Sequence, residues 1–186
     1  MRIIAGEFRG RRLSSPAGRD VRPTSDRARE ALFSILEHGQ PPVRGARFLD
    51  LFCGTGAVGL EALSRGAAEV LLVESEADAL KVARTNLERL GAPENIRLLR
   101  EDATRLGPAP AAFDVVFLDP PYRSGLAAPA LECLIRGDWL AAEARVIVEL
   151  AADDALQLPD GYELEQERRY GAARFLFLRN SSFTSN

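Results

Sequence analysis

A proline-rich motif places an acid and an aromatic ring directly after an apolar run. Asp119-Pro-Pro-Tyr122 follows Phe113–Leu118. Because the two prolines fix the backbone, the aspartate carboxylate and the first proline carbonyl can both accept hydrogens from one NH2 group. Such an acceptor pair frees the lone pair of an aromatic amine for attack on an electrophilic methyl group, and the tyrosine can stack on the base. The predicted catalytic residues are Asp119, Pro120, Pro121 and Tyr122.

A glycine turn forms the second motif. Asp50-Leu-Phe-Cys-Gly-Thr-Gly56 follows a predicted strand and opens a predicted helix. The glycines allow backbone amides to approach a ligand closely, and Glu74, at the end of the next strand, can accept hydrogen bonds from a ribose. Dinucleotide sites share this pattern, so the turn alone leaves a nicotinamide cofactor open.

Two further acids favour S-adenosylmethionine as the ligand of this turn. The charge of Asp50 would repel a pyrophosphate but attract the ammonium group of a methionine moiety. Asp102-Ala103 can meet the amine and a ring nitrogen of an adenine. Each acid can instead cap a helix or a turn. The predicted cofactor-binding residues are Asp50, Phe52, Gly54, Thr55, Gly56, Glu74, Asp102 and Ala103.

Apolar runs that alternate with helical patterns position these motifs. The expected strands are 47–52, 69–74, 96–100, 113–118 and 144–150, and the expected helices are 57–65, 76–90 and 126–136. Strict alternation predicts parallel βαβ units, and the final runs at 162–168 and 173–178 predict an antiparallel hairpin. The sequence therefore predicts an α/β, doubly wound, Rossmann-like fold. Its mostly parallel seven-stranded sheet would be that of class I S-adenosylmethionine-dependent methyltransferases.

The start of the chain differs in charge from the rest. Residues 1–30 hold eight arginines against four acids, a formal charge of +4, whereas the remaining residues carry −7. The pattern predicts a short hairpin around two glycines, a linker at 14–23 and a helix that starts at Thr24 or Ser25 and ends near Gly39. We expect residues 1–40 to form a basic extension, 41–180 a methyltransferase domain and 181–186 a tail.

The basic extension predicts a polyanionic partner, because arginine binds phosphate well. We expect the outward face of the predicted helix to show Arg27, Arg29 and Glu30. Alternatively, single arginines only pair with neighbouring acids on the surface. The predicted RNA-binding residues are Arg9, Arg11, Arg12, Arg22, Arg27 and Arg29.

Composition excludes several other classes of protein. Of the 186 residues, 46% are hydrophobic, which indicates one domain with a core, and no run approaches the roughly 18 apolar residues of a membrane span. The start lacks a secretory signal pattern, and only Cys53 and Cys133 occur, so a reducing cytoplasm is expected. Two cysteines and one histidine cannot complete a four-ligand zinc site, and no metal is expected.

Taken together, the motifs resemble the RsmD family of bacterial ribosomal RNA methyltransferases. The matching stretches are 2–6, 22–33, 50–56, 119–122 and 170–171. The resemblance implies methylation of the N2 amine of one guanine in 16S rRNA, on the assembled small ribosomal subunit or a late precursor. It also implies a role in ribosome biogenesis, with the cofactor and the guanine held by the residues named above. We expect a monomer, since nothing suggests an extended apolar interface.

Three alternatives remain open at this point. One is a methyltransferase that acts on adenine N6 or cytosine N4 in DNA, although such enzymes usually carry a separate target-recognition region. Another is a catalytically silent assembly factor, which the intact Asp119-Pro-Pro-Tyr122 motif disfavours. The third is a nicotinamide-dependent oxidoreductase, for which the chain has no evident acid-base group.

Overall fold

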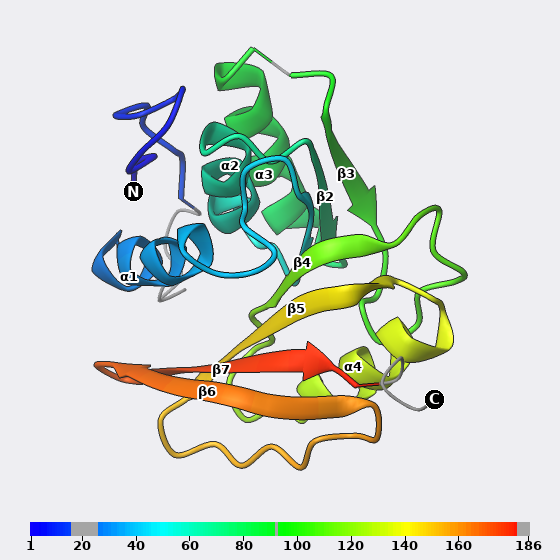
Figure 1. The fold of residues 1–186 in the computed structure, drawn as a ribbon. Helices are drawn as coiled ribbons and strands as arrows, with labels where there is room; N and C mark the ends of the chain where they lie inside the picture. Colours follow the sequence, from blue (N-terminus) through cyan, green and yellow to red (C-terminus); the bar gives the residue numbers. More distant parts are fainter. Residues whose placement is uncertain (16–25, 92, 182–186) are drawn as a thin grey trace.

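A computed structural model describes residues 1–15, 26–91 and 93–181, and its centre is a seven-stranded sheet (Figure 1). The strand order is β3-β2-β1-β4-β5-β7-β6. The strands are β1 (Arg47–Leu51), β2 (Glu69–Glu74), β3 (Ile96–Arg100), β4 (Phe113–Leu118), β5 (Leu140–Ala151), β6 (Tyr162–Tyr170) and β7 (Ala173–Asn180). Neighbours among β1 to β5 are parallel, whereas β7 is antiparallel to β5 and β6. The predicted sheet with its C-terminal antiparallel hairpin is confirmed.

Helices cover both faces of this sheet. They are α1 (Asp26–Glu37), α2 (Ala57–Ser64), α3 (Ala77–Arg89) and α4 (Ala127–Arg136). Apolar residues of α1 and α2 cluster with Val115 and Phe117 of β4, whereas those of α4 cluster with Val116 and Leu118. Because successive side chains of a strand point to opposite faces, α1 and α2 lie on one face and α4 on the other.

The largest difference from the predicted bounds is the start of β5. The strand begins at Leu140, four residues before the expected position, because Leu140 pairs with Phe113 ahead of an irregularity in the register. Ala142 and Glu143 in this extension are exposed. An apolar run could not reveal this extension, because the backbone makes its pairing and the side chains of Ala142 and Glu143 are exposed.

The arm, which we define as residues 1–15, folds back on itself. Arg2 and Arg12 form an antiparallel bridge, which agrees with the predicted hairpin. Ile3 and Leu13 are buried in the same apolar cluster as Phe48 of β1. The arm therefore packs on the body of the protein through its own apolar side chains.

Two residues of α2 hold the arm in place. The buried Glu61 carboxylate accepts the backbone N–H groups of Ile4 and Ala5 at 2.8 and 3.0 Å. The Ser64 carbonyl accepts the N–H of Glu7 at 2.8 Å. At Gly6, φ is 82° and a Cβ atom would lie only 1.8 Å from the Ser64 carbonyl oxygen. Only glycine can therefore take this position while the arm stays docked.

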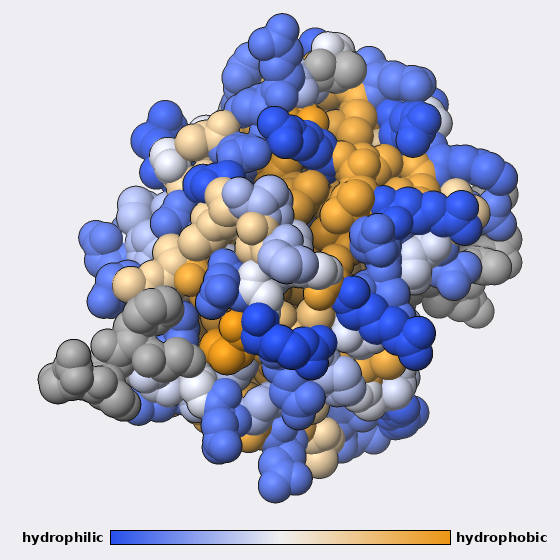
Figure 2. Space-filling view, turned by 90° about the vertical axis from the view of Figure 1, so that its right-hand side faces the viewer, coloured by the Kyte–Doolittle hydropathy of each residue, from blue (hydrophilic) through white to orange (hydrophobic). Residues whose placement is uncertain are grey.

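Figure 2 shows the side of the molecule that lies at the right of Figure 1. Hydrophilic side chains cover most of this side and border an apolar band. Across the described ranges, no helix is long and apolar enough to cross a membrane.

Candidate functional site

Four acidic side chains lie along the carboxyl edge of the sheet, which is the edge where the parallel strands end. We call them the acidic row: Asp50 of β1, Glu74 of β2, Asp119 after β4 and Glu149 of β5. Each lies two residues after an apolar residue that points toward α1 and α2, namely Phe48, Leu72, Phe117 and Ile147 in the same order. Because side chains alternate along a strand, all four acids point to this face.

Glu74 holds the glycine turn. Its Oε2 atom accepts the Gly54 N–H at 2.9 Å, and its Oε1 atom accepts the Glu76 N–H at 2.9 Å. Gly54 has φ 55°, and a Cβ atom there would meet no atom within 4 Å, so the backbone faces open space. Phe52 also has a positive φ, 58°, which is costly for a residue with a side chain. The turn thus exposes its backbone where the sequence predicted a ligand.

Asp50 lies beneath the turn and is almost fully buried. Its Oδ2 atom accepts the Gly59 N–H at 2.8 Å. Burial raises the pKa of Asp50 from 3.8 to about 7; the Gly59 hydrogen bond opposes this shift, and the charge of Glu74 adds to it. At Gly59 a Cβ atom would lie 2.2 Å from Leu72, so glycine lets α2 approach β2 closely. A carboxyl with this pKa is ready to ionise when a cation approaches.

The proline motif lies beside Glu149. The hydroxyl of Tyr122 donates to Oε1 of Glu149 at 3.2 Å. Glu149 is buried, whereas Tyr122 keeps 39% of its surface exposed. Desolvation raises the pKa of Asp119 well above its usual range, and the charges of Glu149 and Asp50 raise it further. Neighbouring members of the acidic row therefore interact through their charges.

The chemistry of the acidic row fits a cationic ligand. Within the described part of the chain, no ion pair joins Asp50, Glu74 or Asp119 to a basic side chain. Buried carboxylates without a counter-charge favour a positively charged partner. A sulfonium and an ammonium group, both present in S-adenosylmethionine, supply such charge. Over the same residues, no group of three or more His, Cys, Asp or Glu is placed to hold a metal ion.

Asp102 and Ala103 follow β3 at the same edge. Asp102 is exposed, and its Oδ1 atom accepts the Thr104 N–H at 2.9 Å and the Thr104 hydroxyl. These bonds lower the pKa of Asp102. The carboxylate thus caps its own turn, while Oδ2 lies 3.8 Å from Arg105 and stays accessible for a ligand. Ala103 is buried.

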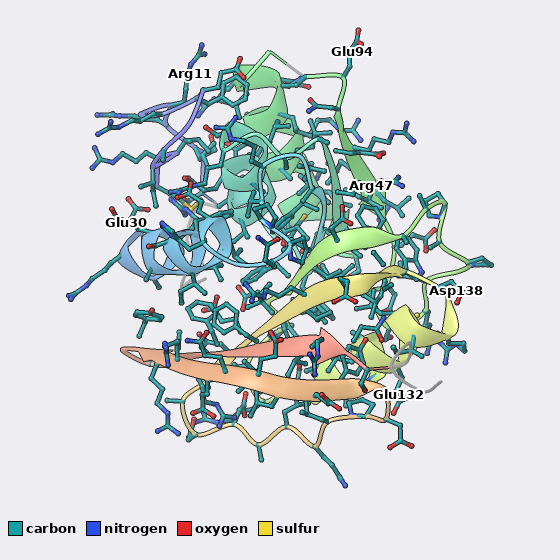
Figure 3. All side chains as sticks on the ribbon, viewed as in Figure 1. Arg11, Glu30, Arg47, Glu94, Glu132 and Asp138 are labelled. Carbon is teal, nitrogen blue, oxygen red and sulfur yellow. The ribbon has the colours of Figure 1, made fainter. Side chains whose placement is uncertain are left out.

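The arginines predicted to bind RNA differ in their exposure. Arg9, Arg11, Arg12 and Arg27 are exposed, and Arg22 lies outside the described residues. Figure 3 shows Arg11 on the arm and Glu30 on α1 at one side of the molecule, with Arg47 and Asp138 at the other side.

Arg29 corrects the prediction. Its side chain is 0% exposed, and the guanidinium donates to the Arg2 carbonyl and to Asp26. Its Nε atom lies 3.8 Å from Glu61. The predicted outward orientation is wrong, because Arg29 shares the inward stripe of α1 with Phe33 and Leu36. Arg29 joins α1 to the arm and cannot reach a phosphate from this position.

Two functional candidates escaped the sequence prediction, although each carries a signal. Glu149 is an acid inside the apolar run 146–150, at the strand end that corresponds to Asp119. Asn86 is an amide on the inward face of α3, three residues after the buried Ala83. Polar residues in such positions need partners, and only the structure identifies them.

Comparisons with known proteins agree with this geometry. The family model described as conserved hypothetical protein 95 matches residues 1–179. Ribosomal RNA small subunit methyltransferase D of Escherichia coli (strain K12) is 38% identical over 177 residues, which are 94% of this chain and 87% of that protein. The protein of the same name from Haemophilus influenzae is 34% identical over 184 residues, or 97% and 94% of the two chains.

A solved structure shows the same likeness in three dimensions. A candidate methyltransferase from Escherichia coli matches with a TM-score of 0.83 and 36% identity, and the match covers 98% of each chain. The strand order and this neighbour identify the Rossmann-like class I methyltransferase fold, as predicted.

Proposed function

Since this chain belongs to the RsmD family of methyltransferases, we propose that it methylates the N2 amine of a guanine in the 16S rRNA of the small ribosomal subunit. The observation that carries the proposal is the acidic row, which includes Asp119 of the Asp119-Pro-Pro-Tyr122 motif and lies on the edge of the sheet where such folds bind ligands. One edge thus offers a cation site and an amine site side by side.

The cofactor residues have distinct roles in this proposal. S-adenosylmethionine, when bound, supplies an electrophilic methyl group on a sulfonium. Glu74 would accept hydrogen bonds from the ribose hydroxyls, and Asp50 would attract the ammonium group. The open backbone at Gly54 would lie against the methionine moiety, flanked by Phe52, Thr55 and Gly56, while Asp102 and Ala103 would bind the adenine.

The proline motif would hold the guanine. The Asp119 carboxylate and the Pro120 carbonyl accept the two hydrogens of the N2 amine, so that the nitrogen lone pair points at the methyl group. Both acceptors also stabilise the positive charge that develops on nitrogen. Pro121 fixes the turn, and Tyr122, held by Glu149, forms a stacking wall.

The exposed arginines of the arm and α1 would bind rRNA phosphates. Their positions support Arg9, Arg11, Arg12 and Arg27, and Arg22 keeps its proposed role from the sequence. We place the protein in the cytoplasm, where the ribosomal subunit is found, and we propose that it acts as a monomer.

The test is transfer of a labelled methyl group from S-adenosylmethionine to small ribosomal subunits that lack the mark. Mass spectrometry of nuclease fragments should locate a single N2-methylguanine. Asp119→Ala should lower the rate at least about 100-fold while the affinity for the cofactor changes little, because the acceptor is lost only at the amine. Labelling of DNA instead of the subunit would overturn the proposal.

A further inference from the structure

Asn86 binds two segments of the chain that lie far apart in sequence. This side chain of α3 is 0% exposed. Its Oδ1 atom accepts the Ser14 N–H at 2.7 Å, and its Nδ2 atom donates to the Ser14 carbonyl at 3.3 Å and to the Thr55 carbonyl at 3.0 Å. One buried amide group therefore satisfies three backbone atoms, two in the arm and one in the glycine turn.

The glycine turn depends on this amide for part of its support. Among the described side chains, Glu74 and Asn86 are the ones that hydrogen-bond the backbone of residues 54–56. Glu74 reaches the turn from the end of β2, whereas Asn86 reaches it from α3. Loss of the amide would leave the Thr55 carbonyl without this donor and loosen the conformation that presents Gly54.

The arm is anchored on the same two helices that flank the turn. Glu61 and Ser64 hold residues 4–8 from α2, the helix that begins at the turn. Near the end of α3, the Arg89 carbonyl accepts a hydrogen bond from the Arg11 guanidinium at 3.2 Å. Asn86 is the one described side chain that hydrogen-bonds both the arm and the turn.

We propose that Asn86 is a positioning residue that couples the arm to the cofactor turn, so that rRNA on the arm and S-adenosylmethionine at the turn strengthen each other's binding. The coupling deepens the proposed function and rests on it. Each partner restrains its own segment, and both segments share one amide. The second partner to bind then loses less conformational freedom, which gives positive cooperativity. Coupling between two sites is reciprocal and typically amounts to about 5- to 150-fold in affinity.

The test measures the dissociation constant of S-adenosylhomocysteine, the product of the cofactor, with and without saturating small ribosomal subunits. In the wild-type protein, subunits should lower this constant at least about five-fold. In Asn86→Ala, the constant without subunits should rise, and the subunits should change it less than about two-fold. Thr85→Ala, an exposed neighbour on the same helix, should behave like the wild type.

A second variant weakens only the arm side of the link. Ser14→Pro removes the N–H that donates to Asn86 Oδ1, the shorter of the two arm bonds, while the carbonyl at position 14 and the bond from Asn86 to Thr55 remain. Its cofactor affinity without subunits should equal that of the wild type, but the subunits should lower the dissociation constant less than they do in the wild type. This result cannot come from a merely structural role of Asn86. Wild-type coupling that persists in Ser14→Pro, or the absence of coupling in the wild type, would overturn the inference. Methyl transfer by the wild-type protein, measured separately, reports on the proposed function itself.

Discussion

The hydroxyl of Tyr122 donates to the Glu149 carboxylate at 3.2 Å and thereby ties an exposed ring to the rigid centre of the sheet. Glu149 lies in β5, which is hydrogen-bonded on both sides, by β4 and by β7. A ring held at its hydroxyl in this way has less freedom to move. Preorganisation of a stacking wall matters because a base must be held at a set distance from the reacting methyl group.

We predict that Tyr122→Phe lowers kcat about ten-fold, equivalent to ~1.4 kcal/mol, with little change in KM. The ring keeps its stacking face but loses its anchor. Tyr122→Ala should cost more, because stacking contributes about 1–3 kcal/mol. Single-turnover methylation of small subunits measures both. If the pair acts as a unit, combining Tyr122→Phe with Glu149→Gln should cost no more than Glu149→Gln alone, and additive losses would contradict the anchoring role.

The pKa of Asp50 predicts opposite effects of pH on stability and on cofactor affinity. Its folded pKa of about 7 exceeds its ordinary value of 3.8, so the folded protein holds an extra proton between these values. Stability should therefore fall as pH rises from 4 to 7, by up to about 4 kcal/mol. A cationic cofactor favours the ionised carboxylate, so its affinity should rise with pH, by up to about ten-fold per unit below pH 7.

Asp50→Asn tests this linkage, since asparagine can still accept the Gly59 N–H. Urea unfolding at several pH values should show a flatter profile for the variant, and calorimetric titration should show loss of cofactor binding. Asp114→Asn is a matched control, because the Asp114 carboxylate also accepts a backbone N–H, from Arg47, but lies outside the acidic row. An unchanged pH profile in Asp50→Asn would refute the assignment.

The sequence predicted the sheet well because buried parallel strands need continuous apolar runs. Runs such as 69–74 and 113–118 are most simply interpreted as buried strands. The glycine turn and the proline motif each follow such a run directly. The prediction for Arg29 is wrong for a physical reason. Its inward position is stabilised by Glu61 on another helix, and no local sequence pattern connects these two residues. Glu149 and Asn86 were missed because their partners are also distant in sequence.

We predict that Gly6→Ala undocks the arm, whereas Gly10→Ala does not. Both glycines have a positive φ, 82° and 83°, so alanine meets the same backbone strain at each. A Cβ at position 10 meets no atom within 4 Å, but one at position 6 would collide with the Ser64 carbonyl. Gly6→Ala should lose at least about 2 kcal/mol more stability than Gly10→Ala in urea unfolding, and it should also lose methylation of subunits. Equal losses for the two variants would mean that the docked arm contributes nothing to stability.

Charge reversal on the arm separates RNA binding from cofactor binding. Arg11 and Arg12 are exposed on the arm, and each phosphate contact adds to an affinity that falls steeply with salt. The double variant Arg11→Glu/Arg12→Glu should bind small subunits at least about 100-fold more weakly, because two attractions become repulsions. Its affinity for S-adenosylhomocysteine without subunits should not change.

The control is Arg136→Glu, which changes an exposed arginine of α4 on the other face of the sheet and should bind subunits like the wild type. Filter binding over a range of salt concentrations checks both, and equal weakening per reversed charge in the two variants would show that net charge, rather than the arm, attracts the RNA.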